Sequence, residues 1–384
     1  MYISQSVIYV GVDDHEIDLF EGQYAVPNGI SYNSYLILDE KTALMDSVDG
    51  RKTEEWLRNV DSALNGRQPD YLVIAHLEPD HSGSIQAAAD RYPDMKLVMS
   101  AKALAMLPQF ANAALSSRAI AVKENDTLIL GSHTLQFMMA PMIHWPEVMV
   151  SYERSEKLLF SADAFGKFGA LDAEEEWLPE ARRYYLNIVG KYGSPVQGLL
   201  KKAAALDIQA ICPLHGPVLR QPLGDYLNKY QEWSSYAPEE KGTLIAYGTL
   251  HGNTAQAALL LADALRAAGE TVAVADLARD DMARALADAF RFDKLVLACP
   301  TYDGGFFPKM EDFLLHLKAK GFQKRRVALI ENGTWAPMAA KGMKSYLEQM
   351  KEITLIDPVV TIKSTLSVDS RAQIAALAEE IAKN

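Results

Sequence analysis

The strongest constraint on the fold is a regular alternation of short apolar runs and helical segments that fills the chain after residue 242. The runs TLIAYG, TVAVADL, KLVLACP and RVALIEN and one further strand each end in a loop that leads into a helical segment. Alternation of this kind is typical of a parallel sheet with helices on both faces, because parallel strands need crossover connections. Ligands of such sheets bind at the carboxyl ends of the strands.

The preceding part of the chain mixes strands and helices without that regularity. Apolar runs typical of strands lie at 71–76, 97–100, 135–144, 157–163 and 208–215. This region is predicted to be α/β or α+β. The polar segment Ser234–Gly242 is typical of a linker. A length of 384 residues suits two domains, which we place at 1–238 and 239–384.

Composition narrows the classes of partner and the cellular location. The formal net charge of -12 argues against nucleic acid and anionic membranes as partners, since both favour a basic surface. No window reaches the roughly eighteen apolar residues of a membrane span, and no signal peptide is recognisable, so we expect a cytoplasmic protein. Cys212 and Cys299 lie in apolar runs and are expected to be buried thiols. Two cysteines cannot supply a four-thiolate metal centre.

Seven residues form a candidate dinuclear metal site. A local cluster follows one predicted strand, and three further residues follow or end other apolar runs: His76, Glu78, Asp80 and His81, then His144, Asp163 and His215. A single histidine or aspartate at a strand end is usually a turn or capping residue, but strand ends gather at one edge of a sheet, so seven together predict two metals. Carboxylates and imidazoles without thiolate suit iron, manganese or zinc, and redox chemistry would favour iron.

Three loops after strands of the second domain form a candidate cofactor site. They contain Thr249, Leu250, His251, Gly252, Asn253 and Thr254, then Pro300, Thr301, Tyr302, Asp303, Gly304 and Gly305, then Asn332, Gly333, Thr334 and Trp335. The first loop precedes a helix, whose free N–H groups and dipole stabilise a phosphate. Tyr302 and Trp335 offer rings that can stack on an isoalloxazine. Each loop alone fits ordinary capping or packing, whereas the three together predict FMN. NAD is not expected, because no G-x-G-x-x-G is present.

The motifs together resemble a known family. The H-x-E-x-D-H cluster, His144 in HWPE, Asp163, His215 in PLHG and the SYNSYLI segment at 31–37 resemble the metallo-β-lactamase-like domain of flavodiiron proteins. The phosphate loop resembles that of flavodoxins. The resemblance, to two-domain A-type members, implies an α/β fold: a metallo-β-lactamase-like αββα sandwich followed by a flavodoxin-like doubly wound parallel sheet. It also implies FMN and two iron ions. Zinc hydrolases of the superfamily usually have histidine where this chain has Glu78, and a carboxylate there favours iron.

The resemblance further implies a role for each residue. His76, Glu78 and His144 would hold the iron nearer the flavin, Asp80 and His215 the second iron, and Asp163 would bridge the two. His81 is the least constrained ligand, since its family counterpart lies in or out of the coordination sphere. The segment between Asp163 and His215 is shorter than the family pattern, which leaves open whether Tyr184, Tyr185 or Tyr192 lies beside the site.

The implied activity is reduction of dioxygen to water or of nitric oxide to nitrous oxide, with a slight preference for dioxygen. The family uses an external electron donor such as rubredoxin and a head-to-tail homodimer or dimer of dimers. We expect the donor at a basic stretch, although a solvated helix end would have the same composition. This stretch contains Lys318, Lys320, Lys324, Arg325 and Arg326.

Two other functions are compatible with parts of the sequence. One is a zinc-dependent hydrolase of the metallo-β-lactamase fold with an accessory flavin domain, which Glu78 and the flavin loops argue against. The other is a pure electron carrier whose first domain is only a scaffold. The complete set of potential ligands argues against this second alternative, because buried carboxylates without a partner are costly.

Overall fold

The structure is a computed structural model that describes residues 2–383, and these divide into two compact units. The first unit runs to Tyr185 and resumes over Ser194–Gln231, whereas the second contains Leu186–Gly193 and the chain from Glu232 onward. The sequence predicts the boundary between the two domains after residue 238. Residues 186–193 instead join the second unit, where the Tyr236 hydroxyl donates to the carbonyl of Gly190 at 3.0 Å.

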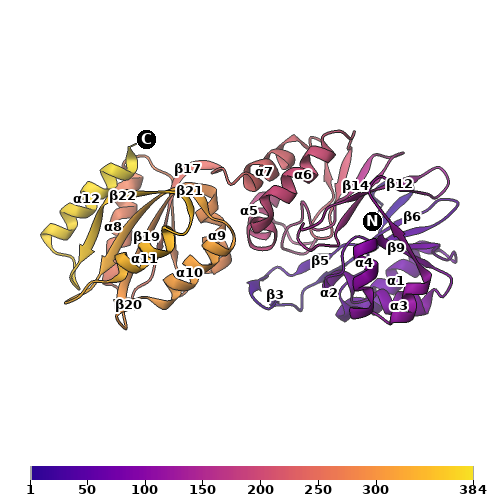
Figure 1. The fold of residues 1–384 in the computed structure, drawn as a ribbon, viewed down its shortest axis with the longest axis horizontal. Helices are drawn as coiled ribbons and strands as arrows, with labels where there is room; N and C mark the ends of the chain where they lie inside the picture. Colours follow the sequence, from indigo (N-terminus) through magenta and orange to yellow (C-terminus); the bar gives the residue numbers. More distant parts are fainter. Residues whose placement is uncertain (1, 384) are drawn as a thin grey trace. The chain divides into compact units, whose positions relative to one another are not determined.

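The first unit is built on two six-stranded sheets (Figure 1). One has the order β1 (Val7–Tyr9), β6 (Tyr35–Ile37), β7 (Ala43–Met45), β8 (Tyr71–Ile74), β9 (Lys96–Ser100) and β10 (Ala119–Val122). The other has the order β11 (Thr127–Ile129), β12 (Thr134–Met139), β13 (Met149–Glu153), β14 (Leu158–Phe160), β15 (Ala210–Cys212) and β16 (Leu219–Arg220). The shorter pairs β2 (Val12–Asp14) with β5 (Ile30–Tyr32) and β3 (Leu19–Phe20) with β4 (Tyr24–Ala25) complete the strands described here.

Helices complete the first unit as an αββα sandwich, as the family resemblance implies. They are α1 (Thr53–Leu64), α2 (Pro79–Ser82), α3 (Ile85–Arg91), α4 (Ala101–Met106), α5 (Trp177–Tyr184), α6 (Gly193–Ala203) and α7 (Gly224–Ser234). Helix α1 shows why such segments are helical: Trp56, Val60 and Leu64 recur every fourth residue and are all buried. It ends where Asn65 takes the left-handed conformation and its N–H donates to the carbonyl of Asp61.

The core of the first unit lies between its two sheets. Buried side chains from the first sheet, such as Tyr35 and Val73, pack in one cluster with Phe137, Met149 and Phe160 from the second. Burying a large apolar side chain stabilises a fold by about 1.5–3 kcal/mol. This shared core therefore fixes the two sheets against each other and, with them, the loops at their strand ends.

The second unit is a doubly wound parallel sheet, which confirms the fold class predicted from the alternating pattern. Its strand order is β18 (Val272–Asp276), β17 (Glu240–Tyr247), β19 (Phe292–Tyr302), β21 (Gln323–Asn332) and β22 (Lys351–Ile362), with β20 (Gly305–Phe306) paired to β19. All four neighbouring pairs on this path are parallel. The first strand thus lies beside the second and third, and the loops after β17 and β19 open at the same edge.

Helices cover both faces of this sheet (Figure 1). They are α8 (Asn253–Ala267), α9 (Met282–Arg291), α10 (Pro308–Ala319), α11 (Ala339–Leu347) and α12 (Val368–Ala382). Helices α8 and α12 share a buried cluster with the strands through residues such as Leu261, Ile330 and Leu377. Cys212 and Cys299 are free and buried in their respective units, as predicted. Within residues 2–383 no helix has the length and apolar character that crossing a membrane requires.

Candidate metal and flavin sites

The local cluster of the first unit is shaped by the turn between β8 and α2. Strand β8 ends at Ile74 and α2 begins at Pro79, so His76 and Glu78 lie in the connection between them. Asp80 and His81 follow in the single turn of α2 and are buried. Proline suits the first position of a helix, because its ring fixes φ and the missing N–H would have no partner there.

The other predicted residues reach the same place from the second sheet. His144 lies in the connection between β12 and β13, and Asp163 follows β14. His215 follows β15, which is the parallel neighbour of β14, so the two residues leave the sheet at the same edge. The structure thus brings all seven predicted side chains together in two adjoining groups: His76, Glu78, His144 and Asp163, and Asp80, His81 and His215.

Asp163 connects the two groups, with one oxygen facing each. Its Oδ2 lies 3.3 Å from the Nε2 of His76 and 3.2 Å from that of His144. Its Oδ1 lies 3.1 Å from the Nε2 of His81 and 3.7 Å from that of His215. A carboxylate shared in this way is the arrangement that can bridge two cations.

Glu78 and Asp80 complete one group each. Glu78 Oε2 lies 3.0 Å from His144 Nε2 and 3.3 Å from His76 Nε2. Asp80 Oδ2 lies 3.2 Å from His215 Nε2 and 3.3 Å from His81 Nε2. All four imidazoles therefore present Nε2 to the carboxylates, which is the atom that a bound metal would take.

Several buried atoms of this cluster make no hydrogen bond within the described residues. They include both carboxylate oxygens of Asp80, Oδ2 of Asp163, and Nε2 of His144 and His215. Buried polar atoms are normally paired, since leaving one unpaired costs about 1–3 kcal/mol. These five atoms belong to the two groups, and carboxylate oxygens and imidazole nitrogens are the atom types that bind iron, manganese or zinc. The residues present therefore fit a pair of metal ions.

Without metal, the cluster is held together by protons. Burial alone would lower the pKa of His81, but the carboxylates of Asp80 and Asp163 outweigh it and raise that pKa to about 9. Burial and the carboxylates of Asp163 and Glu78 act on His144 in the same opposing way, and its pKa is likewise raised to about 9. Metal binding at neutral pH must therefore displace protons from these rings.

Residues that sequence reasoning did not select hold the imidazoles in place. His76 Nδ1 donates to Glu147 Oε1 at 2.7 Å, and His215 Nδ1 donates to the carbonyl oxygen of Ser31 at 2.7 Å. Burial alone would raise the pKa of Glu147, but its hydrogen bonds with His76 and the Leu77 N–H keep it below its usual value. Glu147 therefore stays ionised. It is the last residue of the HWPE motif, in which only His144 was predicted to be a metal ligand.

The SYNSYLI segment supports the loop that carries His215. The Asn33 amide donates to the carbonyls of Pro213 at 2.8 Å and Gly216 at 2.7 Å, and the Tyr35 hydroxyl donates to Pro213 at 2.7 Å. These contacts explain why the segment contains polar residues at these positions. Its polar residues satisfy the carbonyls of the loop that follows β15, which would otherwise be buried without partners.

Aromatic side chains cover the second group. Phe20, from the short β3–β4 pair, lies with its ring centroid 5.4 Å from that of His215, and Tyr184 lies at 5.5 Å. Of the three tyrosines left open by the sequence, Tyr184 is thus the one beside the cluster. Burial, with the carboxylates of Asp163, Asp80 and Glu78, raises its pKa well above the usual value. A cavity of about 460 Å³, lined in part by Phe20, Glu78 and Asp80, opens next to them.

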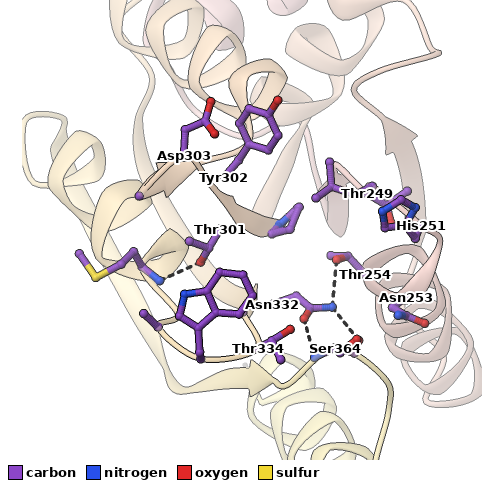
Figure 2. A pocket seen from close by; sticks show the side chains of 17 residues that line it. Thr249, His251, Asn253, Thr254, Thr301, Tyr302, Asp303, Asn332, Thr334 and Ser364 are labelled. Atoms are coloured by element: carbon purple, nitrogen blue, oxygen red, sulfur yellow. Dashed lines mark hydrogen bonds between the residues drawn. The ribbon is translucent and has the colours of Figure 1, made fainter.

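The three predicted loops of the second unit enclose a cavity of about 600 Å³ at the carboxyl ends of the strands (Figure 2). Fourteen of the sixteen predicted residues line it: Thr249, Leu250, His251, Asn253, Thr254, Pro300, Thr301, Tyr302, Asp303, Gly304, Asn332, Gly333, Thr334 and Trp335. Gly252 and Gly305 do not. The structure adds Ala336, Met338 and Ser364. The volume is within the range of small-molecule sites.

Hydrogen bonds fix the polar wall of this cavity (Figure 2). The Asn332 amide donates to the carbonyl of Ser364 at 2.9 Å, and its oxygen accepts from the Ser364 N–H at 2.9 Å. The Thr249 hydroxyl accepts from the N–H of Gly252, whose φ of 89° is the left-handed conformation that favours glycine. Helix α8 begins directly afterwards at Asn253, so its N-terminus faces the cavity, as a phosphate would require.

The apolar side of the cavity is open to solvent. Trp335 is 92% exposed and Tyr302 is 43% exposed. Both side chains line the cavity, and exposed aromatic side chains grouped at a cavity are typical of ligand or partner sites. A phosphate cradle beside exposed rings fits FMN, whose phosphate and isoalloxazine need these two environments.

Not every residue of the basic stretch at 318–326 is exposed to solvent. Arg325 is 2% exposed, and its guanidinium donates to the carbonyls of Phe292 at 2.7 Å and Tyr236 at 2.8 Å. It lies in β21 on the same side of the strand as the buried Val327 and Leu329, so its charge holds the backbone instead of facing a partner. The expectation that Arg325 takes part in docking an acidic donor is therefore wrong.

Comparison with known proteins places both units. The model described as ODP family beta lactamase matches residues 30–216, and the flavodoxin model matches residues 245–373. The anaerobic nitric oxide reductase flavorubredoxin of Vibrio vulnificus is 27% identical over 349 residues, which cover 87% of this chain and 70% of that protein. An uncharacterised protein of Methanocaldococcus jannaschii is 27% identical over 368 residues, 94% of this chain and 92% of that protein.

Solved structures agree over the full length of the chain. The rubredoxin oxygen:oxidoreductase of Desulfovibrio gigas has a TM-score of 0.90 at 27% identity. The match covers 100% of this chain and 98% of that one. The flavodiiron protein of Giardia intestinalis has a TM-score of 0.91 at 23% identity, covering 99% of this chain and 95% of that one. The second similarity supports the fold alone.

A substitution at Asp163 tests the bridged metal pair. We expect the native protein to retain two metal ions per chain, one for each group, and Asp163→Asn to lose both, because the two oxygens of this carboxylate face the two groups. Metal analysis after gel filtration measures the change. Saturating metal, at about a hundred times its Kd, should also stabilise the native protein by about 2.7 kcal/mol.

The matched control is Asp39→Asn, which alters an aspartate bonded to another histidine, His133, at 2.8 Å. It should leave the metal content unchanged. Retention of both ions by Asp163→Asn would rule out the shared carboxylate.

A charge change at the start of α8 tests the flavin cavity. Asn253→Asp places a negative charge in the phosphate cradle, so FMN should bind roughly tenfold more weakly or worse. Riboflavin, which has no phosphate, should bind as before. Fluorescence titration of the flavin-free protein measures both affinities. Gln256→Glu, an exposed position one turn along α8 and outside the cavity, is the control. Equal weakening of FMN and riboflavin would place the phosphate elsewhere.

Proposed function

Since the chain belongs to the flavodiiron family of oxidoreductases, we propose that it reduces dioxygen to water and, at the same site, nitric oxide to nitrous oxide. Dioxygen reduction consumes four electrons and four protons for two waters. Two molecules of nitric oxide consume two electrons and two protons for nitrous oxide and one water. The observation that carries the proposal is the double group of potential ligands with unpaired buried atoms, joined through Asp163.

In this proposal each of the two groups of side chains holds one metal ion. His76, Glu78 and His144 would hold one iron, and Asp80 and His215 the other, with His81 beside it and Asp163 between the two groups. Bound FMN and iron would supply the one-electron redox chemistry that reduction of a diatomic gas needs. The presence of carboxylates instead of thiolates supports iron, and Glu78 in place of a histidine supports it further.

The surrounding residues control water and protons. Phe20 and Tyr184 pack over His215 and exclude bulk water from that side. Burial and the nearby carboxylates of Asp163, Asp80 and Glu78 raise the pKa of Tyr184 well above its usual value, which favours the neutral phenol beside the site. The cavity beside Glu78 and Asp80 offers room for a diatomic gas and for water that supplies protons.

Rapid mixing of the fully reduced holoprotein with each gas tests this function. Flavin reoxidation, followed by absorbance, should be fast with dioxygen and also occur with nitric oxide. Asp163→Asn keeps the flavin cavity but should slow reoxidation roughly 10²-fold or more, because the metal contribution to the barrier is several kcal/mol. The Asp39→Asn variant is again the control.

Each outcome has a distinct meaning. Much faster reaction with nitric oxide would reverse the order of substrates. Slow reaction with both gases, together with bound zinc in place of iron, would return the chain to the zinc-hydrolase alternative. Equal rates in native protein and Asp163→Asn would show that the flavin reacts directly and that the metal groups take no part.

We further propose that electrons pass between two copies in a head-to-tail homodimer, itself able to pair into a dimer of dimers, after delivery by an external donor such as rubredoxin. Support comes from the resemblance to the family and from the exposure of Trp335 and Tyr302, whose rings a second copy could cover. The exposed Lys324, which contacts the carbonyl of Ser235 at 3.1 Å, is one remaining cation of the basic stretch available to a donor.

Mixing two inactive variants tests transfer between copies. Asp163→Asn provides flavin without metal, and Asn253→Asp, freed of flavin by gel filtration, provides metal without flavin. Random exchange makes about half of the dimers mixed, each with one intact flavin–metal pair, so about a quarter of native activity should return. Each variant alone is the control. Failure to recover activity despite subunit exchange, detected with differently tagged copies, would favour transfer within one chain.

A further inference from the structure

Glu147 is a buried anion whose Oε1 and backbone carbonyl are both held by hydrogen bonds. Its side chain is completely buried, and Oε1 accepts from His76 Nδ1 at 2.7 Å and from the Leu77 N–H at 3.0 Å. Its carbonyl accepts from the Ser100 hydroxyl at 2.8 Å. Both the side chain and the backbone are thus fixed, and the carboxylate points at the ring nitrogen of His76 that is directed away from the candidate metal position.

The imidazoles of the two groups have different support. His76 is backed by the Glu147 carboxylate, whereas His215 is backed by the neutral carbonyl of Ser31 at 2.7 Å. Within the described chain, Nδ1 of His81 makes no hydrogen bond. The group around His76 therefore has an anionic hydrogen-bond acceptor behind one of its rings, and for His215 and His81 in the other group no such acceptor is present.

From this difference we propose that Glu147 is a positioning residue that makes the metal position of His76, Glu78 and His144 the more electron-rich of the two. The inference rests on the proposed function, since it concerns iron at these groups. A carboxylate that accepts from an imidazole increases the negative character of that ring, and a ligand of greater negative character stabilises ferric over ferrous iron. With iron bound, the position at Asp80 and His215 would then have the higher reduction potential of the two.

Charge balance points the same way. Glu78, Asp80 and Asp163 supply three negative charges to the two groups, and two divalent ions supply four positive charges. Glu147 adds a further negative charge on the side of His76. The other buried carboxyl nearby, Asp46, interacts electrostatically with both His81 and His76 and therefore does not distinguish the two groups. Replacing Glu147 with a neutral residue leaves an excess positive charge in a buried site, where charges interact strongly.

Glu147→Gln separates charge from hydrogen bonding. The amide oxygen can accept from His76 and Leu77 as the carboxylate does, so ring orientation is kept while the charge is removed. We expect one of the two irons to bind roughly 10–100-fold more weakly. A tenfold larger loss of ferric than of ferrous affinity raises the lower of the two one-electron potentials by about 59 mV. The higher potential should be unchanged. A redox titration of the iron-loaded holoprotein, followed by electron paramagnetic resonance, measures both.

Two further variants provide the controls. Glu153→Gln makes the same change at a fully buried glutamate of β13, where the side chain accepts from the N–H groups of Ser155 at 2.9 Å and Glu156 at 2.6 Å. The histidine with which it interacts electrostatically is His133, which belongs to neither group. It should leave both potentials at native values. Glu147→Asp keeps the charge and shortens the side chain, so it should weaken iron binding with little change in the lower potential.

The results separate this inference from the proposed function. Native protein that binds no iron would contradict the proposed function itself. Two bound irons in the native protein, with both potentials unchanged in Glu147→Gln, would overturn only the role of Glu147. If Glu147→Gln fails to fold, Glu147→Asp decides: a native-like lower potential supports a charge effect, and a rise of about 59 mV or more overturns it.

Discussion

The carboxylate of Asp163 lies fully buried between two groups of imidazoles, and much of the first unit serves to keep it there. A buried carboxylate without partners costs several kcal/mol, so this residue is tolerable only if positive charge surrounds it. Its two oxygens face opposite groups. Protons on the rings or bound cations can provide the charge, and the two compete for the same nitrogen atoms.

That constraint explains why the ligands come from both sheets. A single strand end can present two or three side chains, as the turn between β8 and α2 does with His76, Glu78 and Asp80. Surrounding one carboxylate on all sides requires a second surface. The loops after β14 and β15 supply it, and the core shared by the two sheets fixes the distance between these surfaces. The sandwich is thus the scaffold of the site, with the polar residues gathered at one edge.

Much of this could be predicted from sequence, because strand ends and residue types carry the information. All seven predicted metal-site residues meet, and fourteen of the sixteen predicted flavin residues line one cavity. The contact of His215 with Ser31 could not be predicted, since it uses a backbone carbonyl that every residue possesses. The cover by Phe20 depends on long-range packing with no local pattern. Glu147 is the last residue of HWPE, but only its contact with His76 reveals its role.

The error at Arg325 has a different cause. Reading Lys324, Arg325 and Arg326 as one basic stretch ignored the alternation of a strand, in which Arg325 shares a face with Val327 and Leu329. A charge on a buried face must find partners, and the carbonyls of Phe292 and Tyr236 provide them. Strand periodicity, applied to the charged residues as well as the apolar ones, would have predicted the burial.

The two sites differ in exposure in the way that their proposed roles require. A site that carries out chemistry on a small gas must exclude competing reactions with bulk water, and the aromatic side chains over His215 do this. A site that receives electrons from another protein and passes them on must instead present its cofactor at the surface. The exposed rings of Trp335 and Tyr302 leave the edge of the flavin cavity open. The metal site, at the strand ends of a two-sheet sandwich and covered by Phe20 and Tyr184, and the flavin site, at the open strand ends of a single sheet, each meet one of these demands.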